Sequence, residues 1–105
     1  MILEPVDISD AAAEEIHKIM THKNIGRDYA LRVAVKGMGC GVGFRLGFDK
    51  FKEGDIDYEK KGVKVLVSKR ETMYLLGLTV DFYEGSDARG FVFVKEGQTT
   101  GKTAT

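Results

Sequence analysis

Residues 29–48 read YALRVAVKGMGCGVGFRLGF, and this segment indicates most directly how the chain folds. Both before and after the glycine-rich centre, apolar side chains occupy alternate positions: Tyr29, Leu31, Val33 and Val35, then Phe44, Leu46 and Phe48. Alternation of this kind is typical of strands that bury one face. The stretch therefore predicts two half-buried strands, at 29–36 and 44–49, joined by a glycine loop.

The loop itself surrounds Cys40, the one cysteine of the chain, with four glycines: Gly37, Gly39, Gly41 and Gly43. Glycine is needed where φ is positive or where another group approaches the backbone closely. Lys36 and Arg45 flank the loop, and nearby positive charge favours the thiolate, which is the species that binds iron. A metal centre on Cys40 is one interpretation, and a small buried hydrophobe at a turn is the other.

The rest of the chain predicts one long helix, one short helix and further strands. Residues 9–23 have helical spacing, with Ser9 as the N-cap and an apolar face of Ala12, Ile16, Ile19 and Met20. The remaining predicted elements are a polar edge strand at 55–59, strands at 63–68, 78–83 and 91–95, and a short helix up to Leu76 that a Ser68–Glu71 capping box opens. This order indicates an α+β fold with small antiparallel or mixed sheets.

Length and composition limit the function. The 105 residues fit one domain, which we place at 1–95, followed by a flexible C-terminal tail at 96–105 that has no large apolar side chain. Lys plus Arg equal Asp plus Glu, which argues against nucleic acid as a partner. No apolar run is long enough for a membrane span, and no signal peptide is evident. A single cysteine fits a reducing compartment, so a cytoplasmic protein is expected.

Other candidate motifs fail on spacing. The tail sequence GQTTGKT has three residues between its glycines, whereas a phosphate-binding loop needs four and a following helix. His17 and His22 are five residues apart and do not share a helix face. The acidic residues do not match a calcium loop, so they are expected to be solvated: Asp49, Glu53, Asp55, Asp57 and Glu59. No base is evident beside Cys40, so the sequence does not suggest an enzyme.

Taken together, residues 8–93 resemble the HesB/IscA family, the A-type iron–sulfur carriers. DISDAAAEEIHKIM is similar to the opening helix of the family, ALRVAVKGMGC to the strand that enters its first cysteine motif, and GVKVLVSKRETMYLLGLTVDFYEGSDARGFVF to its second half. The resemblance implies a HesB-like, β-rich domain of two small sheets packed with an N-terminal helix. It also implies a homodimer or tetramer, with the assembly machinery and apo iron–sulfur proteins as partners.

The chain departs from this family at its C-terminus. Family members use three cysteines, one in the glycine loop and two in a C-terminal Cys-Gly-Cys. Cys40 matches the first, whereas the pair would fall near Lys102 and Ala104 and is absent. The resemblance therefore implies that iron or a labile iron–sulfur cluster is held through Cys40 across a dimer, with a small thiol such as glutathione or with oxygen ligands from Tyr29, Asp81 or Glu84. The alternative is a metal-free interaction module in which Cys40 is structural or redox-sensitive.

Overall fold

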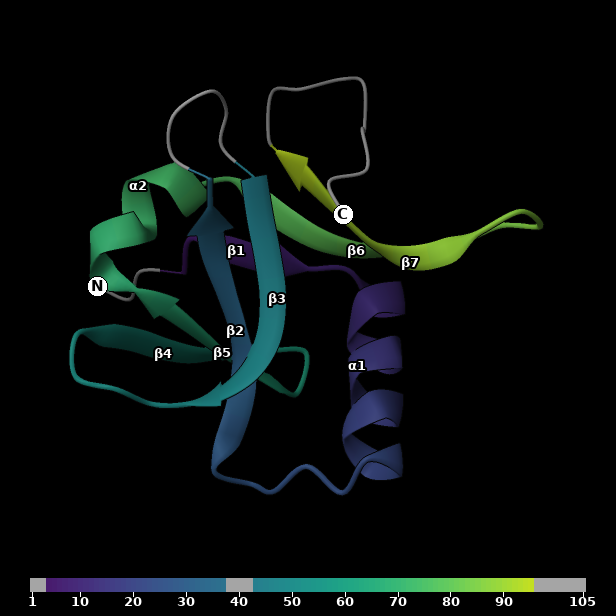
Figure 1. The fold of residues 1–105 in the computed structure, drawn as a ribbon, viewed down its shortest axis with the longest axis horizontal. Coiled ribbons are helices and arrows are strands. Elements are labelled where there is room, and N and C mark those ends of the chain that lie inside the picture. Colours follow the sequence, from purple (N-terminus) through teal and green to yellow (C-terminus); the bar gives the residue numbers. More distant parts are fainter. Residues whose placement is uncertain (1–3, 38–42, 96–105) are drawn as a thin grey trace.

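The computed structural model describes residues 4–37 and 43–95, which form two small sheets, one long helix and one short one (Figure 1). The larger sheet has the order β3-β2-β5-β4, with β2 at Tyr29–Lys36, β3 at Gly43–Lys50, β4 at Asp55–Lys60 and β5 at Val63–Ser68. The smaller sheet has the order β1-β6-β7, with β1 at Val6–Ile8, β6 at Leu78–Glu84 and β7 at Arg89–Lys95. Helix α1 spans Asp10–His22, and a 3-10 turn at Lys69–Glu71 leads into α2 at Thr72–Leu75.

Both sheets are mixed, as the sequence predicts. In the larger sheet β2 is antiparallel to β3 and parallel to β5, and in the smaller sheet β6 is parallel to β1 and antiparallel to β7. The predicted polar strand is indeed an edge strand, β4. The α+β fold with two small sheets and two helices is therefore confirmed.

The alternation in β2 and β3 explains how these two strands contribute to the core. Val35 lies opposite Phe44 and Val33 opposite Leu46, so that apolar pairs meet on the inner face of the sheet. Directly opposed side chains are the main stabilising pairs of an antiparallel sheet. The alternate apolar residues of both strands therefore contribute to the core, as a half-buried pair of strands should.

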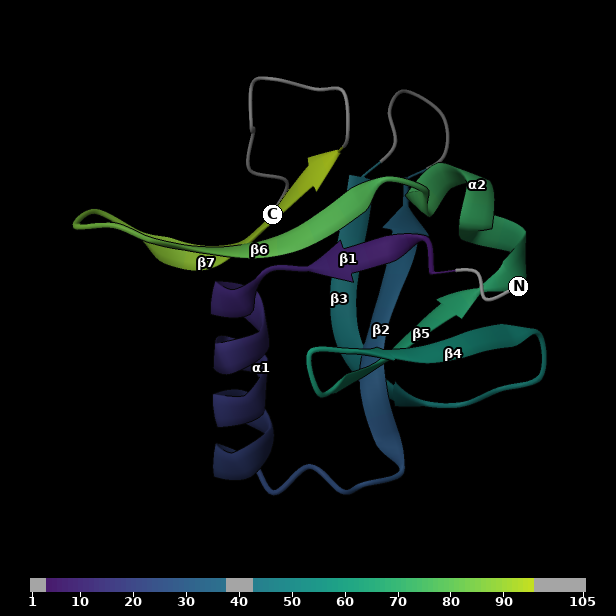
Figure 2. The same ribbon diagram turned by 180° about the vertical axis from the view of Figure 1, so that it is seen from behind.

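Helix α1 lies beside the two sheets and completes the core (Figure 2). The Ser9 Oγ accepts a hydrogen bond from the Ala12 amide at 3.1 Å, which confirms Ser9 as the N-cap. Ala12 and Ile16 are fully buried. Burying a side chain such as Ile16 stabilises a fold by roughly 1.5–3 kcal/mol.

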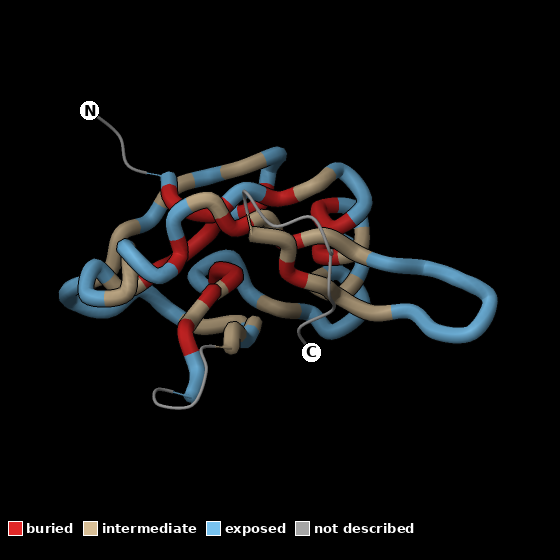
Figure 3. The backbone as a smooth tube through the Cα atoms, turned by 90° about the horizontal axis from the view of Figure 1, so that it is seen from above, coloured by how far each residue is buried: buried red, intermediate tan, exposed pale blue. Residues whose placement is uncertain are grey.

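The hairpin of β6 and β7 extends beyond the rest of the molecule. The tube coloured by burial shows its exposed tip as a long pale loop, and residues 83–89 are all exposed (Figure 3). Gly85 N donates to Ala88 O at 2.8 Å and closes the turn. Within the described residues, no helix is long and apolar enough to cross a membrane.

Two sequence-based expectations about local structure need correction. Strand β1 was not predicted. A strand of three residues is too short to show an alternating pattern, and its partner strand β6 lies far away in the sequence. The predicted capping box is wrong: Ser68 precedes the 3-10 turn but its side chain makes no capping hydrogen bond. Residues 96–105, which the sequence predicts to be a tail, lie outside the described residues.

Candidate functional site

Cys40 itself lies outside the described residues, but the strands that carry its loop are well defined. Lys36 at the end of β2 pairs with Gly43 at the start of β3, so the two ends of the loop are held together by the antiparallel ladder. Gly37, the first residue after β2, has a φ of +73°. Residues with a Cβ rarely adopt this conformation. The prediction that the loop needs glycine torsions is thus confirmed at Gly37.

The carboxylate of Glu71 supports the strand that leads into this loop. Strand β5 pairs with β2 only at Leu31 and Arg32, so the last residues of β2 extend beyond that partner strand. There the Val35 amide donates to Glu71 Oε1 at 3.1 Å. An amide left without an acceptor in a buried position costs about 1–3 kcal/mol. Sequence reasoning assigned Glu71 to a helix cap and missed this role, which only the tertiary fold creates.

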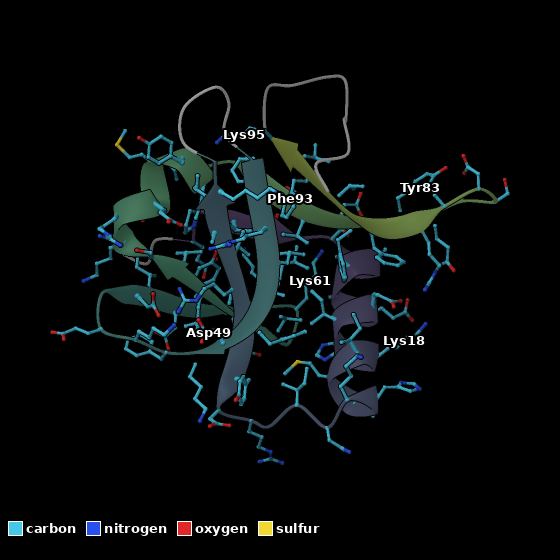
Figure 4. The ribbon with its side chains drawn as sticks, in the orientation of Figure 1. Lys18, Asp49, Lys61, Tyr83, Phe93 and Lys95 are labelled. Atoms are coloured by element: carbon cyan, nitrogen blue, oxygen red, sulfur yellow. The ribbon has the colours of Figure 1, made fainter. Side chains whose placement is uncertain are left out.

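The end of β7 lies next to the base of the Cys40 loop. The ring centroids of Phe44 and Phe93 are 5.5 Å apart, and Lys95 Nζ lies 5.8 Å from the centroid of the Phe44 ring. Figure 4 shows the side chains of Phe93 and Lys95 together at this end of the molecule. Strand β7 therefore ends at the same end of the molecule as β2.

Helix α2 and the residue after it carry three exposed apolar side chains. Met73, Tyr74 and Leu76 are 82%, 45% and 46% exposed, respectively. Lys95 Nζ donates to the Tyr74 carbonyl at 2.6 Å and ties α2 to the end of β7. Large apolar side chains that are exposed in this way are available to contact another protein.

The proposed oxygen ligands are not brought to this place. Tyr29 begins β2 and so lies about 23 Å along the strand from Lys36. The Asp81 carboxylate accepts hydrogen bonds from Ser9 Oγ at 2.6 Å and from the Phe82 amide at 2.8 Å. Glu84 lies on the hairpin tip, 3.5 Å from Arg89. Tyr29 thus lies at the far end of β2 from the Cys40 loop, and Asp81 and Glu84 already have partners within the chain, so an oxygen ligand from one of these three residues stays a prediction.

The two cationic residues that flank the loop do lie on one face. Arg45 lies opposite Ala34, and Ala34 is two residues before Lys36 on β2. The side chains of Lys36 and Arg45 therefore project from the same face of the sheet, and both are exposed. This position is compatible with the predicted effect on a loop thiolate.

Two acidic residues have a structural role instead of a metal-binding one. Arg32 Nε donates to Asp49 at 2.8 Å, and Arg32 Nη1 donates to Asp55 at 3.0 Å. The pKa of Asp55 is lowered mainly by the hydrogen bond from the Arg32 guanidinium. The pKa of Asp49 is lowered mainly by the hydrogen bond from Lys52. The Asp55 side chain is only 5% exposed, so the expectation that it is solvated is wrong.

Comparison with known proteins identifies the fold and the family. The family model described as iron-sulphur cluster biosynthesis matches residues 5–101. Escherichia coli SufA, involved in biosynthesis of iron–sulfur clusters, has a TM-score of 0.77 at 23% identity, covering 94% of this chain and 87% of SufA. IscA with a 2Fe–2S cluster has a TM-score of 0.71 at 23% identity, covering 94% of this chain and 92% of IscA. These two structures establish the fold.

Curated relatives are closer in sequence. The iron–sulfur cluster insertion protein ErpA of Erwinia tasmaniensis is 38% identical over 91 residues, which cover 84% of this chain and 78% of that protein. ErpA of Mannheimia succiniciproducens is 35% identical over 99 residues, which cover 91% of this chain and 86% of that protein. With the family model spanning residues 5–101, this chain belongs to the iron–sulfur cluster biosynthesis family, that of the HesB/IscA A-type carriers.

Proposed function

We propose that this member of the iron–sulfur biosynthesis family holds iron or a labile cluster through Cys40 and delivers it to apo-proteins. Membership of the family and the similarity to ErpA insertion proteins support the delivery role. The single observation that supports the assignment to Cys40 is the base of the loop: Lys36 pairs with Gly43, and Gly37 has a φ of +73°, so the segment that contains the one cysteine of the chain begins and ends at one end of the sheet.

The number of ligands makes a dimer part of the proposal. Within residues 4–37 and 43–95, no three His, Cys, Asp or Glu side chains gather closely enough to hold a metal ion. Clusters are usually held by four thiolates, and one chain supplies only Cys40. A two-fold dimer supplies two Cys40 thiolates, and a small thiol such as glutathione supplies the other ligands.

The exposed surface around the loop favours such an assembly. Met73 and Tyr74 are exposed on α2, which Lys95 links to Phe44 at the base of the loop, so they offer apolar contacts where a second chain or an apo-protein would approach. A centre with only two protein thiolates exchanges its ligands readily, because small thiols dissociate singly. That lability suits a cargo that is handed on, and no catalysed covalent step is required of the protein.

The ligand count also favours a second candidate. Without the C-terminal Cys-Gly-Cys, the chain could keep the fold as a metal-free interaction module. In that case the same apolar surface would bind assembly proteins, and Cys40 would be structural or redox-sensitive.

Cluster transfer distinguishes the two candidates. The protein is loaded anaerobically with iron, sulfide and glutathione, desalted, and mixed with an apo-ferredoxin in the presence of a chelator that traps free iron. The proposal predicts that wild type and the control Ser86→Ala, on the exposed hairpin tip, restore the ferredoxin spectrum, whereas Cys40→Ser does not. Equal transfer by Cys40→Ser, or no transfer by wild type, contradicts the carrier function.

A further inference from the structure

An open groove lies at the opposite end of β2 from the Cys40 loop. It is formed by the C-terminal half of α1, the connection at residues 24–27, the first residue of β2 and the start of β5, and its volume is about 790 Å³. We call it the α1–β5 groove and define it by His17, Met20, Arg27, Tyr29 and Lys64, five of the residues that line it. Sites for small molecules usually have volumes of about 300–1,000 Å³.

The charge in this groove is of one sign. Arg27 and Lys64 line it, His17 adds a third nitrogen-bearing side chain, and none of its described lining residues is an Asp or Glu. The chain as a whole has a formal net charge of zero, so the excess of cations is local. A concave surface lined by one sign of charge concentrates ligands of the opposite sign.

Two carboxylates, that of Asp28, which follows Arg27 in the sequence, and that of Asp10, are paired with lysines. Asp28 lies 3.2 Å from Lys50 Nζ, and Asp10 lies 2.9 Å from Lys61 Nζ. The Arg27 guanidinium, by contrast, has no carboxylate partner among residues 4–37 and 43–95. An arginine presents five donors in a planar fork that matches carboxylate and phosphate groups.

Backbone contacts hold the cationic side of the groove in place. Lys64 Nζ donates to the Arg27 carbonyl at 3.0 Å, so Lys64 reaches across to the residue that carries the guanidinium. His17 Nε2 lies 3.4 Å from the Lys61 carbonyl. These contacts leave the guanidinium itself available for a ligand.

The C-terminal end of α1 repels an anion less strongly than a helix end with free carbonyls would. The carbonyls of Met20 and Thr21 accept hydrogen bonds from the amides of Ile25 and Asn24, at 3.0 and 3.3 Å. Asn24 adopts a φ of +52°, the left-handed conformation that ends helices in this way. The carbonyls of Met20 and Thr21 are thereby satisfied, and the Met20 side chain adds an apolar part to the lining.

We propose that the α1–β5 groove binds a small organic molecule with several oxyanion groups, either a polycarboxylate or a phosphate ester. Arg27 pairs with one oxyanion group in bidentate fashion, Lys64 pairs with another, and Met20 and the Tyr29 ring contact the carbon skeleton. The site is independent of Cys40, because β2 separates the two along its whole length.

Titration of the full-length, nitrogen-15-labelled protein tests this proposal by NMR. Citrate and pyrophosphate are the two probes, one for each source of oxyanion, and sodium chloride at matched ionic strength controls for screening. Saturable shifts of the Gly26 and Gly62 amides with at least one probe are expected, and neither should shift in this way with chloride. No saturable shift with either probe overturns the proposal.

Two variants assign the binding to the groove. Arg27→Gln is expected to weaken binding by about tenfold or more, since a hydrogen bond between charged groups is lost. Arg27 is exposed, and the hydrogen bond that it accepts from Lys64 is made by its backbone carbonyl, which the variant retains, so the variant should keep the structure. The matched control Arg70→Gln, at an exposed position on the 3-10 turn, removes the same charge elsewhere and should change affinity by less than about twofold. Equal weakening by both variants shows unspecific attraction and contradicts the proposal.

A failure here is distinguishable from a failure of the proposed function. Cys40→Ser should bind the probe as wild type does, and Arg27→Gln should load iron and sulfide as wild type does. Loss of probe binding in Cys40→Ser would contradict the independence of the groove.

Discussion

The rings of Phe44 and Phe93 lie with their centroids 5.5 Å apart and join the two sheets at the end that carries the Cys40 loop. Phe44 is the second residue of β3, directly after the loop, and Phe93 is two residues from the end of β7. The start of β3 and the end of β7 are therefore held together by this aromatic contact.

Removing one ring should loosen that junction. Phe93 is 7% exposed, so Phe93→Ala is expected to lower the free energy of unfolding by about 3 kcal/mol, measured by urea denaturation. Phe44→Ala should cost less because Phe44 is half-buried. A double-mutant cycle should give a coupling of about 1 kcal/mol, and strictly additive effects would show that the two rings do not support each other.

Tyr58 links the two sheets through one hydroxyl group. Its OH accepts a hydrogen bond from Val6 N at 2.9 Å and donates one to Val6 O at 2.8 Å. Tyr58→Phe leaves both backbone groups of β1 without this partner and should lower the free energy of unfolding by about 2 kcal/mol. Thermal unfolding measures the loss, and a melting temperature equal to that of wild type would contradict this role.

The Tyr58 hydroxyl should also make the stability of the protein fall at alkaline pH. Burial raises the pKa of Tyr58 from 10.0 to about 12. The unfolded chain therefore loses this proton first as the pH rises, and the stability contributed by the neutral phenol falls between pH 10 and 12. In Tyr58→Phe this part of the pH dependence should disappear, which denaturation curves at several pH values would measure.

Arg32 is predicted to be essential for the connection between β3 and β4. Arg32→Ala leaves the nearly buried Asp55 without its counterion and should cost roughly 3 kcal/mol. Lys50→Ala is the control, because it removes an exposed pair with Asp28 and should cost less than about 1 kcal/mol. Equal losses in the two variants would refute the special role of Arg32.

Acid should weaken the same network. The pKa of Asp55 is lowered by Arg32, so its contribution to stability is complete above the ordinary pKa of 3.8 and is lost as the pH falls below that value. The Arg32→Ala variant should therefore lose less stability than wild type on going from pH 5 to pH 2. A steeper loss in the variant would contradict this explanation.

Glu71 should control the strand that leads into the Cys40 loop. Glu71→Ala removes the acceptor of the Val35 amide, whereas Glu71→Gln keeps an oxygen at the same position. Hydrogen exchange at Val35 is expected to be about tenfold faster in the alanine variant and close to wild type in the glutamine variant. Equal exchange in all three proteins would show that the hydrogen bond does not protect this strand.

Much of the fold could be predicted because its strands carry their own periodic signal. Strands β2 and β3 alternate over eight residues each, and Ser9 precedes the apolar face of α1 as an N-cap does. Strand β1 could not be found, because its three residues become a strand only by pairing with Leu78–Val80. Local patterns predict elements that local interactions define, and they miss those that distant partners create.

In the candidate site, too, some features follow from the local sequence and others only from tertiary packing. The glycine loop around Cys40 and the positive φ of Gly37 follow from residue type. The carboxylate roles do not: Glu71 supports β2 and Asp55 pairs with Arg32 because tertiary packing places them there. No spacing along the sequence indicates which of many acidic residues takes which partner.

The central claim is that Cys40 holds iron or a cluster. Anaerobic reconstitution with iron and sulfide, with and without glutathione, tests it through absorbance between 300 and 600 nm and through bound iron per chain. Charge-transfer bands with bound iron in wild type, both lost in Cys40→Ser, are the predicted result. Wild type and Cys40→Ser that are equally colourless and iron-free under every condition would contradict it.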